Sequence, residues 1–358
     1  MIDIDPWSNA LADYGRLFSQ FGMQEIDSAI TSKLRGKHRL FERNIVFAHR
    51  DFDKFVDAAK NGRKVAVMSG IKPSNEFHLG SKLTADELIY YQKEFGAKVF
   101  YAIADIEAYA DNGISFEESR KVAVSNVADL LALGLDEKNA CIYRQSKEMR
   151  VMNLAYIFSK KVTYNMLRAI YGERDISLYM SVLTQAGDIL MPQLEFGIDY
   201  TVVPVGVDQD PHIRLTRDIA AKLGITLPAS TYHRFMKSLS GTEKMSKRNP
   251  KGIITLADKP EEAGKKVLSA FTGGRTTVDE QKKLGGEIDK CVLYDLSVFH
   301  FENDEACAER KRKCLGGRIM CGACKKEVAA KVRIFLEEHQ KKKEKLVDKA
   351  EKIIEHSN

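Results

Sequence analysis

The chain contains 358 residues, of which 44% are hydrophobic and 30% are charged, and its 56 Lys and Arg against 50 Asp and Glu give a net charge of +6. This composition is typical of a soluble globular protein of about two domains, and the small basic excess is compatible with a polyanionic partner. The start MIDIDPWSNALADYG lacks the basic end and apolar run of a secretory signal, and no later segment reaches the roughly 20 apolar residues of a membrane span. We therefore expect a cytoplasmic protein without a membrane segment.

The first 60 residues are polar, and we expect a mostly helical N-terminal appendix over residues 1–60. Its last part, NIVFAHRDFDKFVDAAKNG, has apolar residues at helical spacing up to a stop at Asn61-Gly62. The pattern then changes to a short apolar strand (64–70), an amphipathic helix (83–96) and a second buried strand (97–105). This order is the βαβ unit of a parallel sheet.

The alternation continues with a helix near FEESRKVAVSNVADLLALG, a strand at ACIYRQS and, after a mainly helical stretch, a β-rich run YTVVPVGVDQD followed by the helix HIRLTRDIAAKLG. The pattern predicts an α/β fold, a Rossmann-like doubly wound parallel sheet over residues 61–255 with a helical insertion at about 147–195. No sheet unit is predicted after about residue 256. We expect residues 256–358 to form an all-helical C-terminal domain that ends in one long helix, VAAKVRIFLEEHQKKKEKLVDKAEKIIEH.

Ligands of doubly wound sheets bind beyond the carboxyl ends of the strands, where this chain has the loop SGIKPSNEFHLGS. The loop contains neither GxGxxG nor GxxxxGK[ST]. Gly70 would allow a ligand to approach the backbone, and His78 and Gly80 precede a helix N-terminus, where phosphate is attracted. The alternative is that His78 is an ordinary capping residue at the surface.

A second loop, GTEKMSKRNP, concentrates the cationic residues Lys244, Lys247 and Arg248 in five positions. Such a loop is either solvated or holds an anion. Further basic clusters occur at residues 310–313, 325–326 and 341–343, so we expect a nucleic acid to bind the C-terminal third. Each cluster alone is also compatible with a solvated helix face.

Five of the six cysteines lie between Cys291 and Cys324. The pair in CGAC (Cys321 and Cys324) together with Cys314 is compatible with a zinc site, but no second pair follows at the spacing of zinc motifs. Reduced structural thiols are the favoured interpretation.

Taken together, the two loops resemble the signature motifs of class I aminoacyl-tRNA synthetases. Residues 78–81 resemble the HIGH motif and residues 244–248 resemble the KMSKS loop, in the same order along the chain. The segments KKVTYNMLRAIYG, VPVGVDQDPHIRLTRDIAAKLG, AFTGGRTTVDEQKKLGG and FLEEHQKKKEKLVDK are similar to the archaeal and eukaryotic tryptophanyl-tRNA synthetase family, and Asp208-Gln209-Asp210-Pro211 favours the tryptophanyl over the tyrosyl branch.

The resemblance implies roles for individual residues. It implies that His78, Lys244, Ser246 and Lys247 act in catalysis. It implies that ATP is contacted by Gly70, Lys72, His78, Gly80, Ser81, Asp208, Lys244, Met245 and Lys247. It implies that tryptophan is contacted by Met68, Glu107, Gln185 and Gln209.

Three positions depart from the family pattern. The fourth HIGH position is Ser81 instead of histidine, and the KMSKS loop ends in Arg248. The eukaryotic members hold the indole nitrogen with a tyrosine and a glutamine, where this chain has Met68 and Ala102. The indole partner is therefore unassigned, with Tyr101 or Tyr109 as the suggested replacements.

The implied activity is ATP-dependent ligation of L-tryptophan to tRNA(Trp) through a tryptophanyl-adenylate, with Mg²⁺ as cofactor. The family also implies a homodimer and an anticodon-binding role for the C-terminal domain. Two alternatives stay open: a tyrosyl-tRNA synthetase, because of Met68 and Ala102, and a non-catalytic tRNA-binding paralogue, because of Ser81 and the basic C-terminal region.

Overall fold

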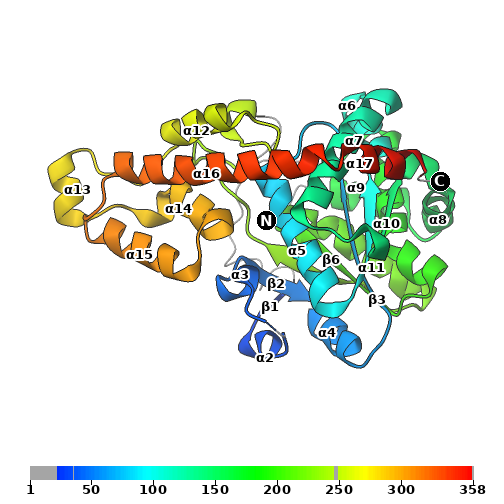
Figure 1. Ribbon diagram of the computed structural model, residues 1–358. Helices are drawn as coiled ribbons and strands as arrows, with labels where there is room; N and C mark the ends of the chain where they lie inside the picture. Colours follow the sequence, from blue (N-terminus) through cyan, green and yellow to red (C-terminus); the bar gives the residue numbers. More distant parts are fainter. Residues whose placement is uncertain (1–21, 35, 246–248, 357–358) are drawn as a thin grey trace.

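A computed structural model describes residues 22–34, 36–245 and 249–356 of the protein (Figure 1). Its centre is a seven-stranded sheet in the order β1-β2-β7-β6-β3-β4-β5. The strands are β1 (Gln24–Glu25), β2 (Val46–Arg50), β3 (Val65–Ile71), β4 (Lys98–Ile103), β5 (Ala140–Arg144), β6 (Tyr200–Gly206) and β7 (Ala229–His233). Strands β3 to β7 pair in parallel, and β1 and β2 are added antiparallel at the β7 edge. The predicted parallel α/β sheet is confirmed.

Helices connect and cover these strands. In the first two thirds of the chain they are α2 (Ser28–Thr31), α3 (Arg39–Glu42), α4 (Phe52–Lys60), α5 (Leu79–Phe95), α6 (Asp105–Asn112), α7 (Phe116–Leu133), α8 (Met149–Ser159), α9 (Tyr164–Tyr171), α10 (Ile176–Phe196) and α11 (Asp210–Leu223), with short 3₁₀ turns η1 (Glu137–Asn139), η2 (Gln145–Lys147) and η3 (Val207–Gln209). The mainly helical stretch expected at 147–195 corresponds to α8, α9 and α10.

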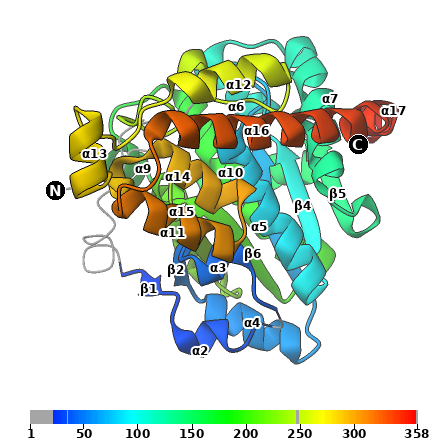
Figure 2. The same cartoon turned by 60° about the vertical axis from the view of Figure 1, so that its left-hand side comes forward.

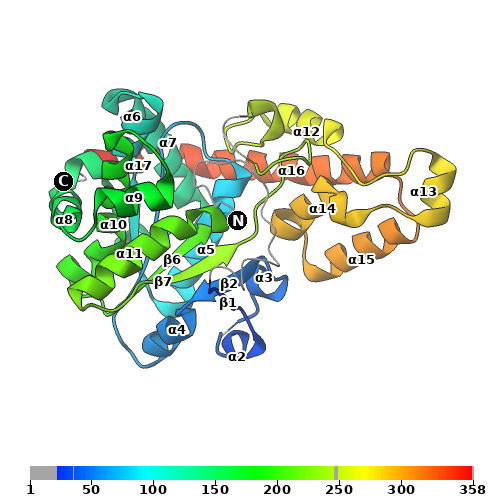
Figure 3. The same ribbon diagram turned by 180° about the vertical axis from the view of Figure 1, so that it is seen from behind.

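Successive side chains of the central strands pack into two different apolar cores, one on each face of the sheet. Val65 and Val67 of β3 pack into the core that contains α5 and α7, whereas Ala66 and Met68 pack into the core of α8, α10 and α11. Successive side chains of a strand point to opposite faces, so both faces of a strand that is apolar throughout are buried. Figure 3 shows α10 and α11 on the side of the sheet that faces away from the viewer in Figure 1.

The N-terminal segment differs from the predicted helical appendix. Residues 46–50 form strand β2, which pairs with β7, and the helix begins only at Phe52. The apolar spacing was compatible with a helix, but Val46, Phe47 and Ala48 are all buried against the sheet, and this pairing determines the conformation. Strand β7, which was not predicted, supplies the partner. The limits of the domains stay a prediction.

The C-terminal part is helical over its described residues. It contains η4 (Pro250–Gly252), α12 (Pro260–Ser269), α13 (Val278–Leu284), η5 (Ile288–Lys290), α14 (Val292–Leu296), the π-helical turn η6 (Ser297–Phe301), α15 (Asp304–Leu315), α16 (Cys321–Glu344) and α17 (Val347–Glu355). The expected single terminal helix is interrupted between α16 and α17.

Helix α16 crosses from the C-terminal helices to the sheet (Figure 1). It packs on α12 at one end and on α7 at the other, where His339 Nε2 lies 2.7 Å and Lys343 Nζ 2.8 Å from the carboxylate of the buried Asp129. The C-terminal end of α16 is thus packed against the sheet domain. Among the described residues, no helix combines the length and the apolar character that a membrane span requires.

Candidate active site

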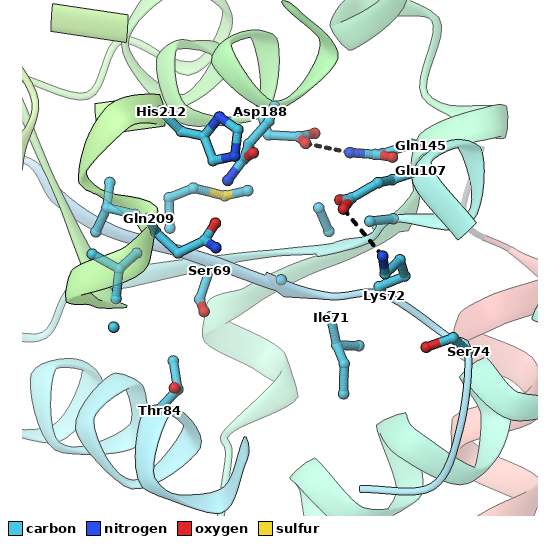
Figure 4. A pocket seen from close by; sticks show the side chains of 18 of the residues that line it. Ser69, Ile71, Lys72, Ser74, Thr84, Glu107, Gln145, Asp188, Gln209 and His212 are labelled. Carbon is cyan, nitrogen blue, oxygen red and sulfur yellow. Dashed lines mark hydrogen bonds and ion pairs between the residues drawn. The ribbon is translucent and has the colours of Figure 1, made fainter. Parts of the chain in front are cut away.

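A cavity of about 640 Å³ opens at the carboxyl ends of β3, β4 and β6 (Figure 4). A smaller cavity of about 210 Å³ adjoins it, and the two share His78, Thr84, Gly206, Lys244 and Met245. Both predicted signature loops therefore meet at one place, as the doubly wound topology requires.

His78 caps the N-terminus of α5. The backbone N–H of Ser81 donates to His78 Nδ1 at 3.1 Å, so the ring carries its hydrogen on Nε2, and the Ser81 hydroxyl lies 3.4 Å from that nitrogen. A side chain at Gly80 would approach the His78 ring to 2.9 Å. Glycine is needed at this position because the capping ring occupies the space. His78 is therefore both a cap and a donor at the helix N-terminus, and the two interpretations from the sequence do not exclude each other.

Gly70 lies at the end of β3 and lines the large cavity. A Cβ at this position would lie 2.7 Å from the carbonyl oxygen of Ala102 on the neighbouring strand. The close spacing of β3 and β4 therefore demands glycine even before a ligand is considered.

Lys244 lies at the boundary of the two cavities. Its Nζ is 2.6 Å from Asp208 Oδ2 and 5.1 Å from the centre of the Phe235 ring. An ammonium held by one carboxylate at a cavity wall is well placed to exchange that partner for a phosphate oxygen. Met245 lines both cavities, whereas the predicted Ser246 and Lys247 lie outside the described residues.

Glu107 lies in the first turn of α6 and faces Lys72 across the mouth of the large cavity (Figure 4). Lys72 Nζ is 3.4 Å from Glu107 Oε1 and 2.5 Å from Asp111 Oδ2, so one cation serves two carboxylates. A bound α-ammonium group could replace Lys72 beside Glu107 without leaving either carboxylate unpaired. Asp111 is one turn after Glu107 and was not singled out from the sequence.

The other predicted tryptophan-binding residues, Met68, Gln185 and Gln209, all line the large cavity. Met68 and Ala102 form part of its apolar wall, together with Ile189 and Val203.

The two tyrosines suggested as indole partners lie elsewhere. Tyr101 is buried in the opposite core, because it alternates with the cavity-lining Ala102 along β4. Tyr109 is 58% exposed and stacks on Phe116, and neither tyrosine lines the cavity. The suggestion of Tyr101 or Tyr109 is wrong.

A buried carboxylate, Asp188 of α10, lies at the inner end of the cavity instead. Tyr143 Oη donates to Asp188 Oδ1 at 2.9 Å. Gln145 Nε2 donates to Oδ2 at 2.6 Å, as Figure 4 shows. Burial, the largest effect, raises the pKa of this carboxyl to about 7 despite the two hydrogen bonds. The sequence signal was a single acid in the apolar run AGDILMP, which helical periodicity alone could not assign to a cavity.

His212 is a second residue that sequence reasoning missed. It lines the cavity from the first turn of α11, and its Nδ1 is 2.9 Å from Tyr171 Oη. Burial lowers its pKa to about 4, so the ring is neutral near pH 7. It forms part of the wall close to Asp188 (Figure 4).

Among the described residues, no group of three or more His, Cys, Asp or Glu is arranged to hold a metal ion. Arg310 Nη1 lies 3.0 Å from Cys324 Sγ, and burial raises the pKa of this thiol to about 11. Cys314 and Cys321 are also free thiols.

The basic clusters are only partly available to a polyanion. Arg310 is buried and pairs with Glu302, and Lys343 pairs with Asp129. Lysines such as Lys325, Lys326 and Lys342 are exposed or partly exposed.

Comparison with known proteins gives a consistent result. Residues 60–337 match the family model described as tRNA synthetases class I (W and Y). The chain is 43% identical to a tryptophan–tRNA ligase of Hyperthermus butylicus, with 98% of each chain covered, and 41% identical to one of Methanocaldococcus jannaschii, with 99% covered. The crystal structure of tryptophanyl-tRNA synthetase from Aeropyrum pernix K1 superimposes with a TM-score of 0.91 at 42% identity over 96% of both chains.

Proposed function

Because the chain belongs to the class I tRNA synthetases of the tryptophan and tyrosine type, we propose that it ligates L-tryptophan to tRNA(Trp) at the expense of ATP. The main support for the proposal is that the two cavities adjoin each other. His78 and Lys244 line both of them. The larger cavity is also lined by Glu107, Gln185 and Asp188. The first step is attack of the tryptophan carboxylate on the α-phosphorus of ATP, which releases pyrophosphate. In the second step the ribose hydroxyl of the terminal tRNA adenosine displaces AMP.

The reaction needs orientation and charge neutralisation more than a covalent nucleophile. His78 donates from Nε2 to a phosphate oxygen, and Gly80 and Ser81 complete the helix N-terminus beneath the nucleotide. Lys244 leaves Asp208 for the phosphates and stabilises the charge that grows on pyrophosphate, a contribution of about 3 kcal/mol for one well-placed donor. Asp208 is then released for the ribose. Lys72, Met245, Ser246 and Lys247 remain proposed ATP contacts.

The amino acid is held at both ends. Its α-ammonium group is paired by Glu107 and by the side-chain oxygens of Gln185 and Gln209. The indole ring lies against Met68 and the apolar wall. We assign the indole N–H to Asp188, whose ionised oxygens keep acceptor capacity after the bonds from Tyr143 and Gln145.

Mg²⁺ is the proposed cofactor. Magnesium usually reaches such sites on the phosphates and takes few protein ligands, so the lack of a preformed cluster among the described residues does not conflict with it. When bound, it supplies further charge neutralisation for the polyphosphate. The acceptor of the second step, tRNA(Trp), is proposed to lie on the exposed lysines of the C-terminal helices, and the protein is proposed to act in the cytoplasm.

A homodimer is also proposed. Helices α8, α9 and α10 expose several large apolar side chains, namely Met149, Tyr156, Ile157, Tyr164 and Ile176, with Ile176 79% exposed. A second copy of the chain that covers this surface would remove them from water. Analytical sedimentation of the wild type and of a Tyr156→Asp variant tests the assignment. The wild type is expected to sediment as a dimer, and the variant is expected to dissociate more readily.

The activity is tested by pyrophosphate exchange into ATP with each of the twenty amino acids. We expect exchange with tryptophan. Because a phenol O–H could also donate to Asp188, tyrosine is the critical comparison, and exchange with tyrosine alone would replace the tryptophan assignment. Salt-sensitive tRNA binding without any exchange would favour the non-catalytic alternative.

A further inference from the structure

A buried cluster of charged side chains lies between α3, α5 and the C-terminal helices. At its centre, Asp86 of α5 accepts hydrogen bonds from Lys82 Nζ at 3.0 and 2.7 Å and from Arg39 Nη2. The fully buried ring of His300 places Nδ1 3.7 Å from Asp86 Oδ2. Burial alone would raise the pKa of the Asp86 carboxyl, but Lys82, His300 and Arg39 outweigh burial and lower it. The ionised carboxylate thus connects the helix that begins at the predicted ATP site with the C-terminal region.

The backbone around His300 is held in a rare conformation. The residue belongs to the π-helical turn η6, and such turns are frequent at functional sites. Arg39 Nε donates to the Phe299 carbonyl at 2.8 Å, and Arg43 Nη1 donates to the Val298 carbonyl at 2.5 Å. These two bonds from the N-terminal segment give the His300 ring a defined position.

The other side of the ring contacts the segment that supports Lys244. His300 Nε2 is 3.0 Å from Met236 Sδ, and the Met236 carbonyl accepts a hydrogen bond from the Met245 amide at 2.7 Å. The next residue, Lys237, forms an antiparallel bridge with Lys244. A shift of Met236 is therefore transmitted through the backbone to Lys244.

A second contact between the C-terminal region and this segment is made by Lys237. Lys237 Nζ donates to the Asp289 carbonyl at 2.6 Å and lies 3.2 Å from Asp295 Oδ2. In Figure 2 the C-terminal helices come forward and lie in front of the sheet domain. Two adjacent residues, Met236 and Lys237, are thus each fixed by the C-terminal region, and both lie beside the loop of the predicted phosphate site: Met236 bonds to the Met245 amide, and Lys237 stands opposite Lys244 in the bridge.

We propose that His300 is a positioning residue for the ATP step, which sets the place of Lys244 through its contact with Met236. This inference rests on the proposed role of Lys244 at the phosphates of ATP. His300 touches no substrate; it transmits the position of the C-terminal helices to the loop, while Arg39 joins Asp86, on the helix that His78 caps, to the carbonyl of the neighbouring Phe299. The C-terminal region is in this way a structural part of the ATP site.

The test compares the full-length wild type with His300→Phe and Met236→Leu, which keep volume and burial but remove the nitrogen or the sulfur. Pyrophosphate exchange gives KM for ATP and for tryptophan separately. Each variant is expected to raise KM for ATP about three- to tenfold, the range for loss of one buried polar contact, with KM for tryptophan unchanged. The double variant is expected to equal the single ones, because both remove the same contact. His300→Gln, which can still donate, is expected to recover part of the loss.

Glu137→Ala is the matched control, since it removes another ion pair between the sheet domain and the C-terminal region, with Lys349 at 2.5 Å, far along the chain from the loop. It is expected to leave both KM values unchanged. An unchanged KM for ATP in Met236→Leu, equal rises for both substrates, or additive effects in the double variant would overturn the proposal. Absence of exchange in the wild type would instead refute the proposed function.

Discussion

Replacement of Asp188 by asparagine tests how the indole ring is recognised. The carboxylate is 1% exposed and already accepts hydrogen bonds from Tyr143 and Gln145. Asparagine has the same shape but only one acceptor oxygen, so its NH₂ group must face one of these donors or the indole N–H. A hydrogen bond to a charged group contributes about 1.5–3 kcal/mol. We therefore expect KM for tryptophan to rise about 10- to 150-fold.

The pH dependence gives a second readout. The pKa of the Asp188 carboxyl is raised from 3.8 to about 7, so the folded protein favours the protonated acid, and this group lowers folding stability as pH rises from about 4 to 7. Indole binding needs the ionised form, which is about one tenth of the total at pH 6 and about nine tenths at pH 8. KM for tryptophan in the wild type is expected to fall as pH rises through 7.

The assay is pyrophosphate exchange at varied tryptophan concentration between pH 6 and pH 8.5. Asp188→Asn is expected to show a flat profile, and an analogue with sulfur in place of the indole N–H should be discriminated by the wild type and not by the variant. Asp199→Asn, which changes a partly exposed carboxylate paired with Arg63, is the control. The assignment would be refuted by an unchanged KM for tryptophan in Asp188→Asn or by an equal pH slope in the two proteins.

The loop lysine, the glycine beside the His78 cap and the buried carboxylate under α16 can each be tested by one substitution. Lys244→Met should reduce the exchange rate by about 100-fold, as removal of one transition-state donor does, while tRNA binding is retained; an unaltered rate would show that the loop has no role at the phosphates. Gly80→Ala should raise KM for ATP, because a Cβ 2.9 Å from the His78 ring displaces the cap, and an unaffected KM would contradict the role of that ring. Asp129→Ala should lower the free energy of unfolding by about 3–5 kcal/mol in denaturant titrations, since His339 and Lys343 lose their buried partner; a loss below 1 kcal/mol would mean that α16 is held by its apolar face alone.

Local patterns in the sequence determined the central strands β3, β4 and β6, the helices between them and the two signature loops. These features depend on neighbours within one turn or one strand, so periodicity and short motifs are sufficient to recognise them. The strand at 46–50 was misassigned because its conformation depends on pairing with β7, which comes about 180 residues later and was itself not recognised.

Which polar groups face the same cavity depends on how distant segments pack together. Asp188, Gln145 and His212 come from three distant segments, and the burial that perturbs the pKa of Asp188 exists only once those segments pack together. Likewise, nothing in the sequence near His300 refers to Met236, yet the folded chain places them 3.0 Å apart. The family and the chemistry of its two loops could be recognised from the local order of residues. Recognition of the tryptophan side chain by Asp188 and support of the ATP site by His300 both depend on long-range packing, which no local pattern encodes.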